Sequence, residues 1–344
     1  MKLFDPFDPN VTVNSMFSNE EIDQLYVFNY MVDVAYLNIL LKQFKIHNIT
    51  IIAQKIYNNK GYRVVNPILP FAYGTHHTKM FVAFYKSTCT ITIHTANILA
   101  VEWKYKTQGY QIITGHLSQN NSIFKSDFIS YINAYKTLPD LTALLRMFHF
   151  DTHKSIVASV PGKFKNNKFG LLRIKSLLSN EQYDTLIIQV SSIPRLGSKY
   201  KNSAIESLVN AFNCKDYCLI YPSSQSVENG HGGSDAGSSL PHQKKYYKNH
   251  KQWLFPHLYH WKSDDATLEL CMPHIKTFAL LKNGDISKVL MSSHNISNAA
   301  WGSVKDGEIF IKSYELGILE EGDKVPFTVP LTPYEEGDDM WTSS

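Results

Sequence analysis

Short apolar runs bounded by polar or turn-forming residues recur along the chain. Runs of this kind, rich in β-branched and aromatic residues, are typical of buried strands. We therefore expect strands at residues 49–53, 80–85, 88–94, 217–221, 278–281 and 289–291. The second and third runs form a pair joined at Lys86 and Ser87, and the last two flank an Asn283-Gly284 turn.

Apolar residues at helical spacing are found in two longer segments, residues 20–44 and 124–145. The first segment is interrupted near residues 29–33, where Asp33 is placed to cap a second helix. Strands alternate with helices in both halves of the chain. This alternation favours an α/β fold in which sheets and helices form layers.

Three segments show neither the helical spacing nor the apolar runs of strands. Residues 1–18 are expected to be an irregular lead-in, and residues 223–237, rich in Ser, Gly and Asn, a mobile surface loop. A Pro, a Gly and polar residues break the pattern at 160–167, which marks a candidate domain boundary. We expect two domains, residues 1–155 and residues 156–344.

The composition is that of a folded globular protein. The 344 residues are enough for two domains or one large one, and 44% of them are apolar and 19% charged. A net charge of +4 is compatible with an anionic partner without requiring one. The 20 Tyr and 19 Phe, interleaved with basic residues, suit stacking on single-stranded nucleic acid, although most are expected in the core.

Metal and membrane chemistry are not expected. The four cysteines, Cys89, Cys214, Cys218 and Cys271, lack paired zinc spacing, so we expect free thiols in a reducing compartment. The N-terminus has no apolar signal core, and no window approaches 18 continuous apolar residues. We therefore expect no metal, no cofactor and no membrane span.

Two stretches, residues 76–103 and 273–301, carry the same polar groups in the same order. Each begins with His-x-Lys, continues through an apolar hairpin and ends in Ser/Thr-x-Asn, with a Trp six residues beyond the Asn. The groups are His77, Lys79, Asn97 and Trp103 in the first stretch and His274, Lys276, Asn295 and Trp301 in the second. Two further His-x-Lys copies, at His242 and His260, have no Asn at the matching distance and are taken as chance.

Strand geometry brings these groups together. Because side chains two residues apart share one face of a strand, the His and the Lys point the same way, and the hairpin returns the Asn beside them. Two such halves facing each other form a site with two imidazoles, two ammonium groups and two amides. Such a site suits a phosphodiester: Lys and Asn bind the anionic oxygens without a metal, one His attacks phosphorus and the other protonates the leaving oxygen. Unrelated polar residues at strand ends would explain one copy but not two matched copies.

These paired motifs resemble those of the phospholipase D superfamily and, within it, the tyrosyl-DNA phosphodiesterase family. Members of that family are eukaryotic enzymes that remove stalled topoisomerase I from DNA 3′ ends. The resemblance covers nearly the whole chain and includes YGTHHTKM at 73–80, IHTAN at 93–97, KTQG at 106–109, FKSDFISYINAY at 124–135, MPHIKT at 272–277, NISNAAWG at 295–302 and SYELG at 313–317. It implies two similar phospholipase D-like domains with mixed sheets flanked by helices, related by a pseudo-two-fold axis, with the active site at their junction.

The resemblance also implies the roles of the motif residues. His77 corresponds to the nucleophile that forms a phosphohistidine with the DNA 3′ end. His274 corresponds to the acid that protonates the departing tyrosine and then to the base that activates water. The residues that correspond to the phosphate clamp are Lys79, Lys276, Asn97 and Asn295.

One departure from the wider superfamily is informative. The Asp that usually follows each Lys by five residues is replaced by Phe84 and Leu281, which is typical of the tyrosyl-DNA branch. By resemblance, the histidine partners are Gln108 and Glu315 instead. A carboxylate such as Glu315 orients and polarises an imidazole, whereas the neutral Gln108 holds its histidine with less effect on charge.

Further residues match positions at which the family contacts DNA. Tyr73 corresponds to an aromatic residue near the scissile nucleotide, where it can stack on a base; a core ring before a strand is the alternative. Ser297 and the backbone of Ala299 are similar to a contact with the next DNA phosphate. Additional DNA contacts are implied at Ser223, Gly237, Ser238, Ser239 and Leu240. The sequence starts close to the first motif, so the long N-terminal extension that is often regulatory in the family is not expected.

The resemblance implies hydrolysis of the bond between a DNA 3′ end and a tyrosine of stalled topoisomerase I, leaving a 3′-phosphate, in DNA repair. The expected substrate is single-stranded or nicked DNA, and the expected protein is a monomer in the nucleus, with the mitochondrion as a second location. Two alternatives stay open. One is a general phosphodiesterase or nuclease that acts on other DNA-end adducts or on phospholipid, and the missing Asp residues count against it. The other is a DNA-end binding module without turnover, and the presence of all six core residues counts against that.

Overall fold

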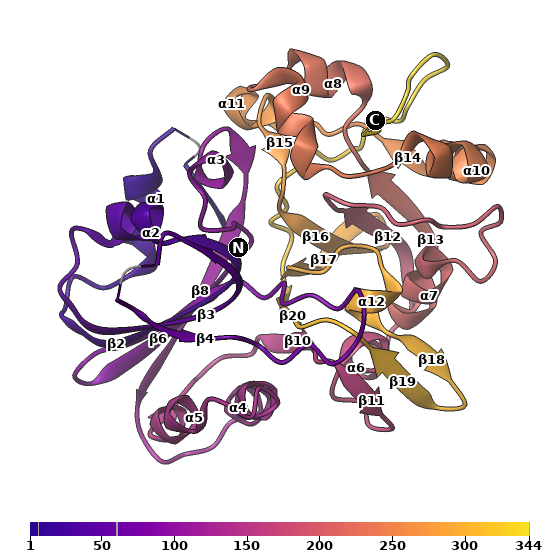
Figure 1. Ribbon diagram of the computed structural model, residues 1–344. Helices are drawn as coiled ribbons and strands as arrows, with labels where there is room; N and C mark the ends of the chain where they lie inside the picture. The colour runs from indigo at the N-terminus through magenta and orange to yellow at the C-terminus, as the bar shows by residue number, and fades with distance from the viewer. Residues whose placement is uncertain (6, 60, 344) are drawn as a thin grey trace.

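The computed structural model describes residues 1–344 apart from residues 6, 60 and 344. Two β-sheets lie side by side, one from each half of the chain, with helices around them (Figure 1). The strand order in the first sheet is β1 (Lys2–Leu3), β8 (Gly109–Leu117), β6 (Thr88–His94), β5 (Met80–Phe84), β2 (Ile22–Asp33), β3 (Ile46–Tyr57) and β4 (Arg63–Val65), and β9 (Phe148–His149) also pairs with β8. The order in the second sheet is β10 (Ser155–Ser159), β20 (Glu315–Glu321), β17 (Asp285–Ser292), β16 (Lys276–Lys282), β12 (Tyr183–Gln189), β13 (Cys214–Ile220) and β14 (Leu258–Tyr259).

The two sheets have the same construction. In each sheet a central antiparallel hairpin, β5 with β6 or β16 with β17, is extended by an antiparallel strand, β8 or β20. On the other side, β2 or β12 pairs antiparallel with the hairpin and parallel with the strands that follow it. The expected α/β class, with two similar halves built on mixed sheets and flanked by helices, is confirmed. Both predicted hairpins are confirmed as well, including the Asn283-Gly284 turn, where both residues have positive φ.

Short helices connect and cover the strands. In the first half they are α1 (Pro9–Met16), α2 (Val34–Leu41), α3 (Ala100–Trp103), α4 (Ile123–Asn133) and α5 (Pro139–Arg146). In the second half they are α6 (Gly170–Leu177), α7 (Ala204–Ala211), α8 (Ser224–Asn229), α9 (Gly233–Ala236), α10 (Lys244–Leu254), α11 (Ala266–Glu269) and α12 (Asn298–Trp301), with 3-10 turns η1 (Gly237–Ser239) and η2 (Phe255–His257). Two small sheets complete the fold: β7 (Lys106–Thr107) with β15 (Met272–Pro273), and β11 (Gly162–Phe164) with β19 (Glu308–Ile311) and β18 (Ser303–Lys305).

The first sheet is buried on both faces. Val27 and Phe81 point to the cluster that contains Leu37 of α2, whereas the next residues along the strands, Phe28 and Val82, point to the cluster of α4. Successive side chains of a strand alternate between the two faces, so a strand covered on both sides is apolar throughout. This explains the continuous apolar run of β5, whose five residues are all buried.

The same double burial makes one prediction wrong. Residues 22–33 form the long strand β2 rather than a helix, because both of its faces are covered and the apolar positions therefore lack a clean period of two. The predicted cap is confirmed: the side chain of Asp33 accepts a hydrogen bond from Ala35 N (2.9 Å) at the start of α2.

Two other segments are more ordered than predicted. Within residues 1–18, Asp8 caps helix α1 and Pro9 occupies its first turn, where proline is favoured. Residues 223–237 form the short helices α8 and α9 instead of a loop, and Ser223 caps α8. Ser and Gly at helix ends thus account for a composition that was interpreted as a loop.

The two halves share part of their core. The largest hydrophobic cluster contains residues of both sheets, such as Phe128 and Phe278. The second sheet begins with β10 at Ser155, and the domain boundary between residues 155 and 156 stays a prediction. In the part of the chain that the structure describes, no helix is long and apolar enough to cross a membrane.

Candidate active site

Each His-x-Lys motif leads into the central hairpin of its sheet. His77 lies just before β5 and His274 just before β16. Backbone hydrogen bonds tie each of them to the opposite half: His77 N donates to Tyr314 O (2.9 Å), and His274 N donates to Thr107 O (3.0 Å). Residues that are far apart in the sequence thus meet at one seam between the sheets.

A cleft of about 550 Å³ opens along this seam. Among the residues predicted for the site, those that line it are Tyr73, His77, Asn97, Ser238, Ser239, His274, Asn295, Ser297, Ala299 and Glu315. Lys79, Lys276 and Gln108 lie behind the wall, with exposed fractions of 1%, 0% and 0%. Both halves therefore contribute imidazole, amide and ammonium groups to one place.

His77 is held by acceptors of the second half. Its Nδ1 lies 2.8 Å from Ser293 O and 3.0 Å from Glu315 Oε2, and Ser293 Oγ donates to the same carboxylate oxygen. Since both partners of Nδ1 accept hydrogen bonds, Nδ1 carries the proton, and Nε2 keeps its lone pair when the ring is neutral. Burial and the nearby Lys79 lower the pKa of His77, so the neutral ring is favoured, although Glu315 opposes this shift.

Glu315 is buried but stays ionised. Burial acts to raise its pKa, yet the neighbouring His77 and the hydrogen bonds from His77 and Ser293 outweigh burial, so the pKa lies below its ordinary value. Buried carboxylates are stabilised in this way when they are paired and hydrogen-bonded. Glu315 can therefore orient and polarise the His77 ring.

His274 has a different set of neighbours, all from the first half. Its Nδ1 lies 3.1 Å from Gln108 Nε2 and 3.4 Å from Gln108 Oε1, and 3.1 Å from Glu102 Oε2. Glu102 in turn pairs with the buried Lys106 (Nζ to Oε1, 3.5 Å). Burial, followed by the charges of Lys276 and Lys106, holds the pKa of His274 well below its ordinary value.

The two motif lysines lie under the histidines. Lys79 Nζ donates to His77 O (3.0 Å), and Lys276 Nζ donates to His274 O. Burial lowers the pKa of Lys79 to about 8, and burial together with the charge of Lys79 lowers that of Lys276 well below its usual range. Two buried ammonium groups close together lack a full set of counter-charges, which is an arrangement that favours an anionic ligand.

The motif asparagines differ in their support. Asn295 Oδ1 accepts hydrogen bonds from Ser191 N (3.1 Å) and Ser192 N (3.0 Å), so its amide NH₂ group is left to donate to a ligand. Asn97 is held through its backbone, because its carbonyl accepts from Trp103 Nε1 (2.8 Å). The repeated tryptophan thus has a structural role beside the site in the first half.

The predicted DNA contacts are only partly gathered at the cleft. Tyr73 is 90% exposed at the cleft, with φ of 63°, so the alternative of a core ring is wrong. Ser297 caps α12, and Ala299 O accepts hydrogen bonds from Lys312 N and Ser313 N, which fixes this part of the wall.

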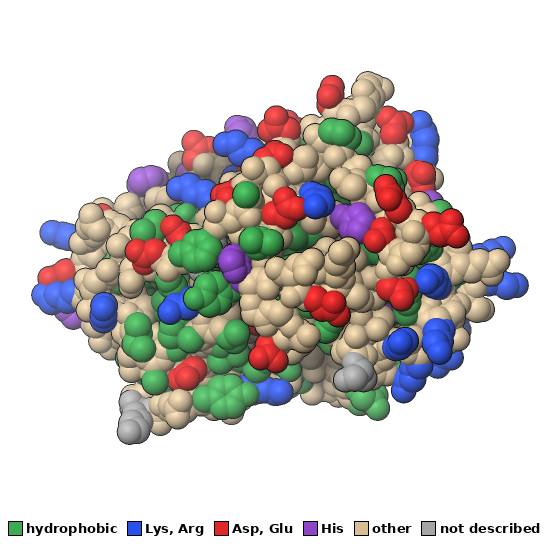
Figure 2. All heavy atoms as spheres, turned by 90° about the horizontal axis from the view of Figure 1, so that it is seen from above, with side chains coloured by type: hydrophobic (Ala, Val, Ile, Leu, Met, Phe, Trp, Pro, Cys, Tyr) green, Lys and Arg blue, Asp and Glu red, His purple; other side chains and the backbone are tan. Residues whose placement is uncertain are grey.

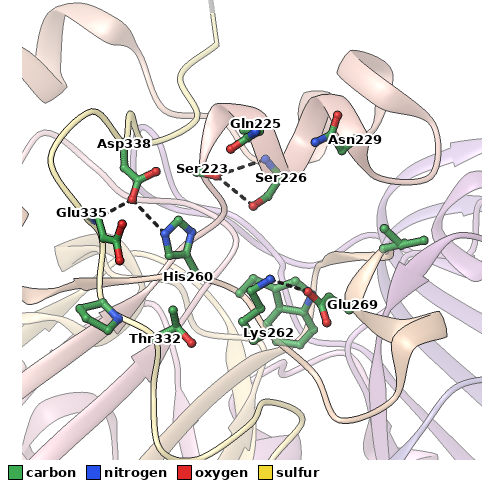
Figure 3. Close-up of a pocket in the computed structure, with 13 residues that line it drawn as sticks. Ser223, Gln225, Ser226, Asn229, His260, Lys262, Glu269, Thr332, Glu335 and Asp338 are labelled. Atoms are coloured by element: carbon green, nitrogen blue, oxygen red, sulfur yellow. Dashed lines mark hydrogen bonds and ion pairs between the residues drawn. The ribbon is translucent and has the colours of Figure 1, made fainter.

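Ser223 lies elsewhere. It caps α8 beside a separate cavity of about 390 Å³, where it contacts Ser226, and the pair His260–Asp338 lines the same cavity (Figure 3). Gly237 packs against the ring of Trp341, and Leu240 is buried in the core. These positions do not face the cleft in the structure, whereas Ser238 and Ser239 do.

The adjacent His76, in contrast to His77, is a core residue. Its Nδ1 lies 2.8 Å from Asn29 O and its Nε2 lies 2.9 Å from Tyr135 OH, and burial lowers its pKa to about 3. His242 is buried against Ile193, and His260 lines the separate cavity. Of the four His-x-Lys copies, the two with matching Asn residues are those at the cleft.

Sequence reasoning missed four residues that line the cleft beside the motif side chains. They are Glu102, Lys106, Ser191 and Ser192. Glu102 directly precedes the repeated Trp103, but the matching position before Trp301 is Ala300, so the repeat itself gave no signal. Ser191 and Ser192 follow β12. Serines after a buried strand indicate only that the strand has ended, which is a weak signal for a functional residue.

The charges of the site favour a phosphodiester. In their ordinary protonation states, the three lysines Lys79, Lys106 and Lys276 and the two carboxylates of Glu102 and Glu315 leave one positive charge in excess when both imidazoles are neutral. One imidazole with a free Nε2 can attack phosphorus, and the second can transfer the proton of the leaving oxygen. Within the described part of the chain, no group of three or more His, Cys, Asp or Glu side chains is placed to hold a metal ion.

Comparisons with known proteins point the same way. A model of the tyrosyl-DNA phosphodiesterase family matches residues 8–323. Tyrosyl-DNA phosphodiesterase 1 of Arabidopsis thaliana is 30% identical over 291 residues, which is 74% of this chain and 48% of the relative, so the chain spans about half of that protein's length. A probable tyrosyl-DNA phosphodiesterase of Caenorhabditis elegans is 28% identical over 327 residues, 83% of this chain and 72% of the relative.

A solved structure shares the fold. The crystal structure of yeast tyrosyl-DNA phosphodiesterase superposes with a TM-score of 0.78 at 20% identity, over 95% of this chain and 94% of the yeast chain. The chain therefore shares its overall fold with the yeast protein.

Proposed function

Because the chain belongs to the tyrosyl-DNA phosphodiesterase family, we propose that it hydrolyses the phosphodiester between a DNA 3′ end and a tyrosine, through a covalent phosphohistidine. The observation that carries this proposal is the exchange of partners between the halves. His77 and His274 line one cleft, and each Nδ1 is held by side chains of the opposite half. Both rings therefore present Nε2 as the atom available for chemistry.

In the first step, His77 Nε2 attacks phosphorus. A nitrogen–phosphorus bond forms while the bond from phosphorus to the tyrosine oxygen breaks, and its electron pair moves to that oxygen. His274, protonated on Nε2, gives its proton to the departing phenolate. The ammonium groups of Lys79 and Lys276 and the amides of Asn97 and Asn295 bind the equatorial phosphate oxygens, whose negative charge they stabilise.

In the second step, His274 Nε2 takes a proton from water. The water oxygen bonds to phosphorus, the nitrogen–phosphorus bond breaks, and its electron pair returns to His77. The product is DNA with a 3′-phosphate, and His274 is protonated again for the next cycle. His274 therefore acts as an acid in the first step and as a base in the second, because the nitrogen that has given up its proton is then free to take one from water.

The low pKa of His274 in the free protein sets a condition on the first step. A bound phosphodiester adds negative charge next to the ring, which opposes the effect of Lys276 and Lys106 and favours the protonated form. Substrate binding and protonation of His274 are thus coupled. His274 therefore becomes an acid when the substrate that needs its proton is bound.

The surface is consistent with DNA as a partner. Lysine and arginine side chains gather along the right-hand edge of the face shown in Figure 2, the side on which α10 lies in Figure 1. Exposed residues of α10 and its surroundings include Lys199, Lys201, Lys244, Lys245, Lys248 and Lys251. Basic groups of this kind bind the phosphate backbone without regard to sequence. Tyr73, exposed at the cleft, is placed to stack on a base.

The proposal extends to the biological substrate. We infer a monomer that acts on single-stranded or nicked DNA carrying a topoisomerase I peptide, in DNA repair. A nuclear location follows from that substrate, with the mitochondrion as a second DNA-containing compartment. Fluorescence imaging of the tagged protein tests the location. The substrate is tested by the fraction of topoisomerase I adducts that remain on DNA in cells without this protein.

The central test uses a single-stranded oligonucleotide with a 3′-phosphotyrosine, incubated with the protein in EDTA. We expect release of tyrosine and a 3′-phosphate end by the wild type and by His116→Ala, an exposed histidine, but not by His77→Ala. Activity that is lost in EDTA would contradict the metal-independent scheme. Binding of the oligonucleotide without product would indicate a DNA-end binding module instead.

A further inference from the structure

We propose that Glu102 is the positioning residue of His274: its carboxylate holds the ring in the tautomer with the proton on Nδ1, so that Nε2 can act as base in the second step. Glu102 lies in α3, and its Oε2 is 3.1 Å from His274 Nδ1. Both side chains are 8% exposed. This inference rests on the proposed function and assigns a residue that the paired motifs do not contain.

The hydrogen bonds of Gln108 fix the direction of its amide. Thr95 Oγ1, which accepts from Gly109 N (3.0 Å), donates to Gln108 Oε1 (2.7 Å) in preference to the more distant Gly109 O (3.5 Å), which agrees with an oxygen at this amide atom. Gln108 Nε2 then lies 3.0 Å from Glu102 Oε2 and 3.3 Å from Glu102 O, two acceptors on one residue. The amide has two hydrogens, and both have a partner on Glu102.

It follows that Gln108 has no hydrogen left for the imidazole. His274 Nδ1 faces an amide nitrogen that is already engaged, the carboxylate oxygen Glu102 Oε2 and, at 3.4 Å, Gln108 Oε1. Both of these oxygens are acceptors, so Nδ1 must be the donor. With the proton on Nδ1, the neutral ring has its lone pair on Nε2, which is the form that can take a proton from water.

Removal of the carboxylate would reverse this arrangement. When the carboxylate is replaced by an amide, as in Glu102→Gln, an NH₂ group can donate to His274 Nδ1 in place of the acceptor, and the ring proton then moves to Nε2. A neutral ring with its proton on Nε2 cannot activate water. The same logic makes the carboxylate of a Ser-His-Asp triad necessary for the correct tautomer.

The repeat explains why this carboxylate lies outside the motif. Thr107 and Tyr314 accept the backbone hydrogen bonds of the two histidines, so the residues that follow them, Gln108 and Glu315, occupy matching positions. One half thus has a carboxylate at this position and the other an amide. The half with the amide has a carboxylate at position 102 instead, where the other half has Ala300. Each imidazole therefore has one carboxylate oxygen near Nδ1, at 3.0 Å and 3.1 Å.

The test compares two leaving groups on the same oligonucleotide, a 3′-phosphotyrosine and a 3′-p-nitrophenyl phosphate. The p-nitrophenolate departs without an acid, so its release in the first step depends on His77 alone, whereas hydrolysis of the adduct still needs His274 as base. We expect Glu102→Gln to release one equivalent of p-nitrophenolate rapidly and then to turn over about 10- to 100-fold more slowly than the wild type, the usual range for a residue that orients a site imidazole. The covalent DNA adduct should accumulate on a denaturing gel.

Controls separate this role from a structural one. Glu102→Asp, which keeps a carboxylate, should turn over faster than Glu102→Gln in the slow phase. Glu320→Gln, which changes a half-buried residue paired with Lys154 away from the cleft, should behave as the wild type. An equal loss with both leaving groups and no rapid phase would overturn the proposal, as would unchanged turnover. A wild type without activity on either substrate would instead reject the proposed function. If Glu102→Gln does not fold, ¹⁵N spectra of the histidines in the wild type decide, because a His274 proton on Nε2 contradicts the proposal.

Discussion

The Nδ1 atom of His77 lies 3.0 Å from Oε2 of Glu315, although 238 residues separate the two in the chain. The imidazole is 16% exposed and the carboxylate 5%, so water competes little for either group. A buried, oriented carboxylate fixes both the direction and the tautomer of the ring it contacts. The reactive nitrogen of one half is therefore aimed by a residue of the other half.

Glu315→Gln tests this relationship. The amide keeps the size of the side chain but removes the charge, while Ser293 O still accepts from His77 Nδ1. We expect kcat on the 3′-phosphotyrosyl oligonucleotide to fall by about 10- to 100-fold with little change in KM, because the nucleophile is less polarised but the phosphate clamp is intact. Glu321→Gln, on the same strand and 85% exposed, is the matched control and should leave kcat unchanged.

Replacement of His274 by Asn should trap the intermediate. The amide cannot take a proton from water, so the second step should slow more than the first, and the oligonucleotide should remain attached to His77. Denaturing gels and the mass of the modified peptide measure this adduct. An absence of any adduct, together with slow release of a 3′-phosphate, would contradict the assigned order of roles.

The pH dependence of the p-nitrophenyl substrate should reflect His77 and Lys79. Burial lowers the pKa of His77, so the ring stays neutral and nucleophilic below pH 6.5, and the acidic limb of kcat/KM should lie below that value. Burial lowers the pKa of Lys79 to about 8, so the clamp loses charge as the pH rises, and kcat/KM should fall above about pH 8. An acidic limb at or above pH 6.5, or a flat profile up to pH 10, would be inconsistent with this site.

Stability should fall in acid because of the buried histidines. His94 stacks on Phe81 with ring centroids 4.7 Å apart, and burial lowers its pKa to about 3. A folded-state pKa below the unfolded value of 6.5 means that only the unfolded chain takes up the proton, so stability is lost as the pH falls from 6.5 towards 3. In His94→Phe the unfolded chain no longer takes up this proton. For each pH unit between 6.5 and 3, the free energy of unfolding of the variant should therefore decrease by about 1.4 kcal/mol less than that of the wild type. Urea unfolding at pH 6 and pH 4 measures the difference, with the exposed His116→Phe as control.

The central hairpins and the motif residues were predictable because their pattern is local. His-x-Lys at a strand start, a short polar turn and an Asn after the return strand are fixed by the period of two and by hairpin geometry. Two copies made the pattern specific. The same local logic identified Asp33 as a helix cap.

The partners of the histidines depend on long-range packing. Glu102 reaches His274 only because β7 and β15 pair across the two halves, and a single acidic residue in a short helix has no periodic signal. Strand β2 was mistaken for a helix since sheet faces covered on both sides hide the alternation that marks a strand. Ser223 was placed by resemblance alone, and its neighbours in the fold are those of a helix cap.

The reciprocal contacts also constrain how such a chain could arise. An ancestral protein with one motif would have had no partner for its own imidazole, so two copies would have had to associate about a two-fold axis to complete the pair of sites. Once two such copies are joined in one chain, corresponding positions can diverge. Gln108 and Glu315 are one such divergence, and Glu102 and Ala300 are its counterpart. Acid and nucleophile thus occupy matching positions of the repeat in two different surroundings.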